Sequence, residues 1–213
     1  MKNMKPQTFM EILGSERASA IIRTDKQETA AKAMDAAIRG GFRIVEFTLT
    51  IPGAFELISE FSKRPDIVVG AGTVLTIEDA RKSRQSGAHF LVSPVVDEIV
   101  IREAHSLELA VIPGTQTPTE MWKAHQLGAQ CQKLFPAPGT GPEYVRSTLA
   151  PMPFLKLVPT NGITLENAAE YLRAGAFAVG FVKALFDADD LRSGNFDRTR
   201  DRAAQCLASI RNR

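Results

Sequence analysis

Lys133 is a charged residue inside an apolar run. The stretch AQCQKLFPAP, residues 129–138, places it directly before Leu134 and Phe135. Lysine is rarely buried unless it is paired with an opposite charge or has a chemical role. An amine withdrawn from water has a lowered pKa, and its neutral form can attack a ketone to form a Schiff base. Lys133 is therefore a candidate nucleophile.

Glu46 is the candidate partner of this lysine. In RIVEFTL, residues 43–49, alternate residues face the same side of a strand, so Ile44, Glu46 and Thr48 share the inner face. A carboxylate on that face is costly unless it is paired or functional. An iminium ion promotes cleavage of a nearby carbon–carbon bond, and a carboxylate can move the protons that this cleavage requires. Lys133 and Glu46 together indicate the chemistry of an aldolase.

Two observations leave other interpretations open. A buried Lys–Glu pair can be purely structural. A shifted pKa does not by itself identify a catalytic group, because structural ion-pair networks also shift pKa values. Lys156, in the stretch FLKLVPT, has the same inward parity on the next predicted strand. Periodicity alone does not choose between Lys133 and Lys156 as the nucleophile.

Short apolar runs that end in Gly, Pro, Ser or Thr recur along the chain, with starts roughly 20 to 24 residues apart, and each is a candidate strand. The candidate strands are residues 19–24, 43–48, 67–73, 89–94, 109–115, 132–137, 154–160 and 177–181. The stretches between them have helical patterns that end at glycine, as in 26–41, 76–88, 117–129 and 164–176.

Alternating strands and helices predict an α/β fold with a parallel sheet. Eight such units indicate a (β/α)8 TIM barrel, with its active site at the carboxyl ends of the strands. The alternative, a doubly wound open sheet, is disfavoured because no GxGxxG follows the first candidate strand. We expect residues 1–213 to form a single barrel domain with an N-terminal helix and a closing helix near 197–213.

The composition of the 213 residues excludes several other classes of protein. The net charge is only +2 and no basic block stands out, so a nucleic-acid partner is not expected. No apolar run is long enough to span a membrane, and the first residues do not resemble a secretory signal. The two cysteines and three histidines have no disulfide or metal-site spacing, so we expect a cytoplasmic protein without a metal.

A set of motifs carries a more specific signal. They lie in a fixed order at predicted strand ends: EFTL (46–49), GAGTVL (70–75), VSP (92–94), IPGTQTPTE (112–120), KLFPA (133–137) and PTNGI (159–163). This ordered set resembles the KDPG/KHG aldolase family. Members of that family cleave 2-keto-3-deoxy-6-phosphogluconate or 4-hydroxy-2-oxoglutarate to pyruvate and an aldehyde through a Schiff base.

The resemblance implies a role for individual residues of this chain. Lys133 is then the Schiff-base nucleophile, Glu46 the general acid/base, and Thr73 a contact for the carboxylate of pyruvate. It also implies a homotrimer that needs no cofactor and no metal. Further residues that the resemblance and the predicted strand ends place in the substrate pocket are Pro94, Gly114, Thr115, Phe135, Thr160, Asn161, Gly162, Gly180 and Lys183.

The chain departs from the family pattern on the rim of the expected site. Thr50 stands where well-known members have an arginine for the keto-acid carboxylate, and a hydroxyl cannot supply that charged, bidentate contact. Arg23, at the end of the first strand, is a candidate replacement. The family's phosphate cradle usually has Gly-Gly after the seventh strand, where this chain reads Thr160-Asn161-Gly162, although backbone N–H groups near Gly162 could still bind an anion. The family often has Gly-Gly-Ser near the end of the eighth strand, where this chain reads Gly180-Phe181-Val182-Lys183.

These departures motivate alternatives to an aldolase of unchanged specificity. One is an altered-specificity or non-catalytic barrel that binds a keto acid or a sugar phosphate. Another is a phosphate-binding isomerase on a similar barrel, because a fold alone does not determine function. Retention of both Lys133 and Glu46 favours the aldolase with a small-molecule substrate.

Overall fold

The computed structural model describes residues 4–211, in which helices alternate with parallel strands. The strands are β1 (Ala18–Ile22), β2 (Ile44–Thr48), β3 (Val68–Gly72), β4 (Phe90–Val92), β5 (Ala110–Ile112), β6 (Gly114–Thr115), β7 (Gln132–Leu134), β8 (Leu157–Pro159) and β9 (Val179–Phe181). The helices are α1 (Pro6–Glu16), α2 (Gln27–Arg39), α3 (Ala54–Phe61), α4 (Ile77–Gln85), α5 (Glu98–Ser106), α6 (Pro118–Gln126), α7 (Pro142–Leu149), α8 (Ala168–Arg173), α9 (Ala188–Ser193) and α10 (Phe196–Arg211). Every predicted apolar run therefore contains a strand.

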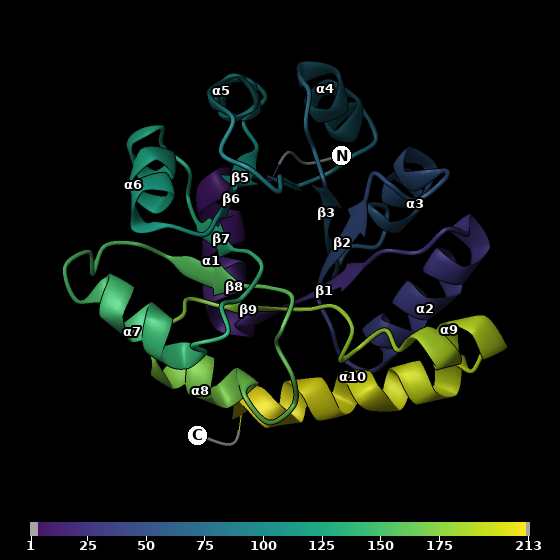
Figure 1. Ribbon diagram of the computed structural model, residues 1–213. Coiled ribbons are helices and arrows are strands. Elements are labelled where there is room, and N and C mark those ends of the chain that lie inside the picture. The colour runs from purple at the N-terminus through teal and green to yellow at the C-terminus, as the bar shows by residue number, and fades with distance from the viewer. Residues whose placement is uncertain (1–3, 212–213) are drawn as a thin grey trace.

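The strands form a curved parallel sheet with helices on its outer side (Figure 1). Six strands follow the order β5-β4-β3-β2-β1-β9, and three more follow the order β6-β7-β8. A parallel bridge between Thr160 and Gly180 lies between the ends of the two sets. The predicted α/β class with a parallel sheet is thus confirmed.

The predicted strand 109–115 is interrupted in the structure. It divides into β5 and β6 at Pro113, which has no N–H to donate to a neighbouring strand. The Pro113 carbonyl still accepts a hydrogen bond of 2.9 Å from the Lys133 N–H. The interruption therefore falls beside the strand that carries the candidate nucleophile.

Two apolar layers hold the sheet. The larger layer packs the outer faces of the strands against the helices. The smaller one fills the inside of the curve and includes Phe9, Met10 and Leu13 of α1. Phe9 stacks on Phe90 with ring centres 4.5 Å apart, so the predicted N-terminal helix closes one end of the curved sheet. The candidate site lies at the opposite end, where the strands terminate at their carboxyl ends.

The C-terminal helix α10 packs closely against α2, as Figure 1 shows. Gly40, which follows α2, makes this approach possible: a Cβ there would lie 2.4 Å from Ala203 Cβ and 2.5 Å from the Arg200 carbonyl oxygen. No helix within the described chain is both long and apolar enough to cross a membrane.

We expect Gly40→Ala to destabilise the fold by about 1–3 kcal/mol, because the added methyl group overpacks the contact between α2 and α10. Chemical denaturation with urea measures the change. Gly139→Ala is the matched control, since a Cβ at Gly139 has no atom within 4 Å. Equal stability of the two variants would show that α10 does not depend on this close approach.

Candidate active site

Lys133 lies on the inner side of the curved sheet. It pairs with Gly114 of β6 on one side and Val158 of β8 on the other, in the middle of β7. The residue is only 9% exposed, and its Nζ lies 4.9 Å from the centre of the Phe135 ring. The predicted inward direction of this side chain is confirmed, because Lys133 lines both a buried cavity and the open pocket above it.

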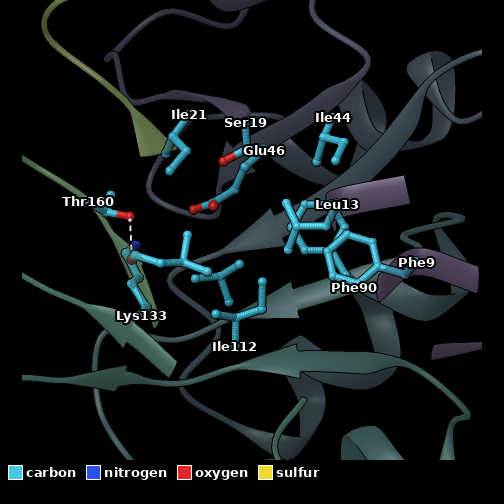
Figure 2. A pocket seen from close by; sticks show the side chains of 12 residues that line it. Phe9, Leu13, Ser19, Ile21, Ile44, Glu46, Phe90, Ile112, Lys133 and Thr160 are labelled. Carbon is cyan, nitrogen blue, oxygen red and sulfur yellow. Dashed lines mark hydrogen bonds between the residues drawn. The ribbon is translucent and has the colours of Figure 1, made fainter. Parts of the chain in front are cut away.

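Glu46 reaches the same cavity from β2. Figure 2 shows the two side chains entering the cavity from different walls. Glu46 is 2% exposed, and its Oε1 has no hydrogen-bond partner within residues 4–211. A Cβ on Gly72 would lie 2.1 Å from that oxygen, so the absence of a side chain on β3 makes room for the carboxylate.

The pKa of the Glu46 carboxyl is raised above its ordinary value. Burial is the largest cause, and the positive charges of Lys133 and Arg23 oppose it without cancelling it. A carboxyl group in this state can hold or release a proton nearer to neutral pH than an exposed glutamate does. The geometry thus provides an amine and a proton-transfer group in one enclosed space.

An open pocket of about 380 Å³ lies above the cavity, at the carboxyl ends of the strands. It brings together eight of the residues selected from the sequence: Arg23, Thr73, Pro94, Lys133, Phe135, Thr160, Asn161 and Lys183. The backbones of Thr73 and Asn161 are left-handed, with φ of 63° and 61°. Such conformations are unfavourable for non-glycine residues and often occur at functional sites.

Four other selected residues stand outside the lining of that pocket. Gly114 and Thr115 line an adjoining pocket of about 420 Å³, which shares Pro94 and Phe135 with the first. Gly162 and Gly180 are not lining residues of either pocket. Gly180 instead allows β8 and β9 to approach, since a Cβ there would lie 2.6 Å from Thr160 Oγ1. The expected direct contact of Gly162 and Gly180 with substrate is thus not supported by the pocket geometry.

Arg23 lies on the rim of the open pocket. Its Nη2 donates a hydrogen bond of 3.2 Å to Thr73 Oγ1, which links the ends of β1 and β3. Thr50, by contrast, is exposed and its hydroxyl lies 3.0 Å from that of Thr48. Arg23 therefore provides a fixed positive charge in the pocket, and Thr50 does not line it.

Comparisons with known proteins agree with this geometry. The family model for KDPG and KHG aldolase matches residues 10–201. The chain is 32% identical over 205 residues to the 2-dehydro-3-deoxy-phosphogluconate aldolase of Treponema pallidum (strain Nichols). This match covers 95% of this chain and 98% of the relative. It is 31% identical to the 2-dehydro-3-deoxy-6-phosphogalactonate aldolase of Escherichia coli (strain K12), over 90% of this chain and 93% of the relative.

The chain belongs to the KDPG and KHG aldolase family. The resemblance inferred from the ordered motifs is therefore confirmed. A native KDPGal structure superimposes with a TM-score of 0.84 at 30% identity, covering 91% of this chain and 94% of the other. A KDPG aldolase structure from Legionella pneumophila, with pyruvate captured as a covalent carbinolamine intermediate, superimposes with a TM-score of 0.83 at 25% identity, covering 96% and 97%.

The structure separates the two lysines that periodicity left equivalent. Lys156 precedes β8 and is exposed, with its Nζ 5.2 Å from the centre of the Phe177 ring. It lies at the amino end of a strand whose carboxyl end leads to Thr160 in the pocket. Parity along a strand gives the face of a residue but not its depth, which is why the two lysines could not be distinguished.

The sequence-based selection missed several lining residues, among them Ile21, Thr48 and Ser19. Ile21 and Thr48 line the open pocket, and Ser19 lines the buried cavity. The alternation of each strand was the signal for them: Ser19 and Ile21 share a face of β1, and Thr48 shares a face of β2 with Glu46.

Within the described chain, no group of three or more His, Cys, Asp or Glu side chains is arranged to hold a metal ion.

We expect Glu46→Gln to change how stability depends on pH. A carboxyl whose pKa is raised by folding keeps its proton after the unfolded chain has lost it, so stability falls as pH rises from the ordinary carboxyl pKa through the raised one. Glutamine does not ionise, so the variant lacks this fall in stability with rising pH. Urea denaturation at about pH 4 and about pH 7.5 should show a smaller decrease for the variant than for the wild type.

Glu56→Gln on α3 is the control, because that side chain is exposed. It should follow the wild-type dependence. An identical pH dependence for Glu46→Gln and the wild type would contradict the raised pKa of Glu46.

Proposed function

We propose that the protein is a Schiff-base aldolase, a carbon–carbon lyase that forms pyruvate and an aldehyde. The proposed substrate is a 2-keto-3-deoxy-6-phospho sugar acid or 4-hydroxy-2-oxoglutarate, as the names of its relatives suggest. The observation that carries the proposal is the burial of Lys133 and Glu46 around one cavity directly beneath the open pocket at the carboxyl ends of the strands. An imine-forming amine beside a carboxyl group is the arrangement that this reaction needs.

In the proposed reaction, the neutral Lys133 amine attacks the C2 ketone and gives a carbinolamine. Loss of water, with proton transfer through Glu46, gives the iminium ion. Glu46 then takes the proton of the C4 hydroxyl, the C3–C4 bond breaks, and the aldehyde leaves. The electron pair of that bond forms an enamine on Lys133, which is protonated at C3, and hydrolysis of the imine releases pyruvate and regenerates the amine.

The pocket residues have proposed roles in holding the substrate. Arg23 and Thr73, joined by their hydrogen bond, bind the carboxylate next to the reacting ketone. Lys183 and Asn161 lie on the same pocket and attract the anionic group at the far end of the substrate. The residues that shape the walls are Pro94, Gly114, Thr115, Phe135 and Thr160. Gly162 and Gly180 act indirectly: Gly162 adopts a left-handed backbone, with φ of 115°, and Gly180 lets β8 and β9 approach each other.

We further propose a single closed (β/α)8 barrel domain for the chain. Pairing of β9 with β1 and the bridge between Thr160 and Gly180 support closure on one side. On the other side, β5 and β6 follow one another across Pro113 and act as one bent strand. The resemblance to the family supports a homotrimer, and two free cysteines fit a reducing cytoplasm.

One observation favours an altered specificity within this function. Thr50 does not line the pocket, so the charge next to the ketone comes from Arg23 on another strand. A carboxylate held from β1 instead of from the loop after β2 enters the pocket in a different direction. The aldehyde half accepted by this enzyme is therefore proposed to differ from that of relatives that carry the arginine after β2.

Incubation with pyruvate and sodium borohydride tests the proposal, with the adduct located by peptide mass spectrometry. We expect a reduced pyruvate adduct on Lys133, and we expect Lys133→Ala to lose both the adduct and turnover. Lys156→Ala is the matched control and should keep both, because Lys156 is exposed at the other end of β8. Normal turnover by Lys133→Ala, or tight binding of a sugar phosphate without any adduct, would refute the aldolase.

The role of Arg23 has its own test. We expect Arg23→Met to raise KM for pyruvate, measured in the condensation direction, by roughly 10- to 100-fold, the size of one hydrogen-bonded charge contact. Arg43→Met is the control, because Arg43 precedes β2 at the amino end and pairs with Asp66. An unchanged KM for Arg23→Met would assign the carboxylate contact to another residue.

A further inference from the structure

A small cavity lies directly beneath the candidate active site. Ile21, Lys133 and Thr160 line both the cavity and the open pocket above it. Apolar side chains from α1 and the strands form most of the cavity wall (Figure 2). The polar side chains that line it are Ser19, Glu46, Lys133 and Thr160.

Two of these groups lack hydrogen bonds that buried polar groups normally make. Glu46 Oε1 is fully buried and has no hydrogen-bond partner within residues 4–211. Ser19 is 7% exposed, and its hydroxyl forms no hydrogen bond to any residue in the same range. Thr160 is different, since its Oγ1 donates to the Val158 carbonyl at 3.3 Å. A fully buried polar atom without a partner is rare and destabilising, so a missing partner is indicated for Glu46 Oε1.

The strand register prevents a side-by-side pairing of Ser19 with Glu46. Ile21 of β1 stands opposite Glu46, and Ser19 lies two residues earlier on the same face. Ser19 is paired with Gly180, whose missing side chain leaves room for Thr160 Oγ1 and Ile21 Cδ1, two neighbours of the cavity. The space open to a water-sized sphere in the cavity is about 10 Å³, close to what one buried water needs.

We infer that one ordered water occupies this cavity and bridges Ser19 Oγ to the Glu46 carboxylate, which makes Ser19 a positioning residue for the proton-transfer group. The inference rests on the proposed aldolase function. Four polar side chains line the cavity, and a buried water usually makes two to four hydrogen bonds. The site is polar enough to hold the water and too small to admit substrate.

The bridge has a specific consequence for catalysis. Water that donates a hydrogen bond to the carboxylate stabilises its charged form and fixes its direction. The charged groups that face Glu46 are Lys133 from β7 and Arg23 from β1, and both act in the same sense. Ser19 adds a neutral contribution from below, on the side away from substrate. Loss of the Ser19 hydroxyl therefore leaves Glu46 harder to ionise and less well oriented.

The experiment compares Ser19→Ala with Ser19→Thr, which restores a hydroxyl, and with Ser83→Ala as a control. Ser83 is also a fully buried serine whose hydroxyl lacks a partner, but it lies on α4 away from the cavity. Two readouts are taken across pH: borohydride trapping of the pyruvate imine, which depends on Lys133, and exchange of the pyruvate methyl protons in D2O, which also requires a base. Crystal structures of the wild type and Ser19→Ala locate the water.

We expect the wild type to contain the water and Ser19→Ala to lose or displace it. Imine trapping by Ser19→Ala should match trapping by the wild type. The acid limb of its exchange-rate profile should move to higher pH by roughly one unit, which corresponds in free energy to part of one hydrogen bond to a charged group. Ser19→Thr should return the limb to its wild-type position, and Ser83→Ala should not move it.

An empty cavity in the wild-type crystal structure, or an exchange profile of Ser19→Ala identical to that of the wild type, would overturn the inference while trapping still supports the aldolase. Absence of any trapped imine in the wild type would instead remove the proposed function. Should Ser19→Ala fail to fold, the water in the wild-type crystal structure and the profile of Ser19→Thr decide the matter.

Discussion

The burial of two ionisable groups inside a curved sheet is the constraint on which the rest of the structure depends. Lys133 and Glu46 project into an interior that is mostly apolar, where an unpaired charge would be strongly unfavourable. The fold tolerates them because positions around them lack side chains. Gly72 leaves room for the carboxylate, and Gly180 lets neighbouring strands approach closely. Space next to the Glu46 carboxylate is thus created by a glycine on the adjacent strand β3.

The two ends of the curved sheet have different roles, because all strands are parallel and their amino ends lie at one end and their carboxyl ends at the other. At the amino ends, α1 inserts Phe9 and Leu13 and completes an apolar core. At the carboxyl ends, loops with left-handed residues such as Thr73 and Asn161 surround the open pocket. Stability is therefore supplied mainly below the reacting groups, and the strained, polar backbone lies above them, where substrate enters.

Specificity and chemistry are separated in this molecule. The proposed reacting pair, Lys133 and Glu46, is held by the centres of β7 and β2, which have neighbouring strands on both sides. The charged residues that are proposed to meet the substrate, Arg23 and Lys183, follow strand ends and line the open pocket. Rim residues can change without disturbing the core, which is how a family can keep one imine-forming centre while its members accept different substrates.

The sequence alone determined the α/β class, the order of strands and helices, and the inward direction of Lys133 and Glu46, because these follow from periodicity and from ordered motifs that act locally. The tertiary structure decided what depends on depth and on neighbouring strands. It set Lys156 apart from the pocket, divided the predicted strand at Pro113, and withdrew Gly162 and Gly180 from the pocket lining. A pattern along one strand fixes a face, whereas register and the packing of adjacent strands fix which atoms meet.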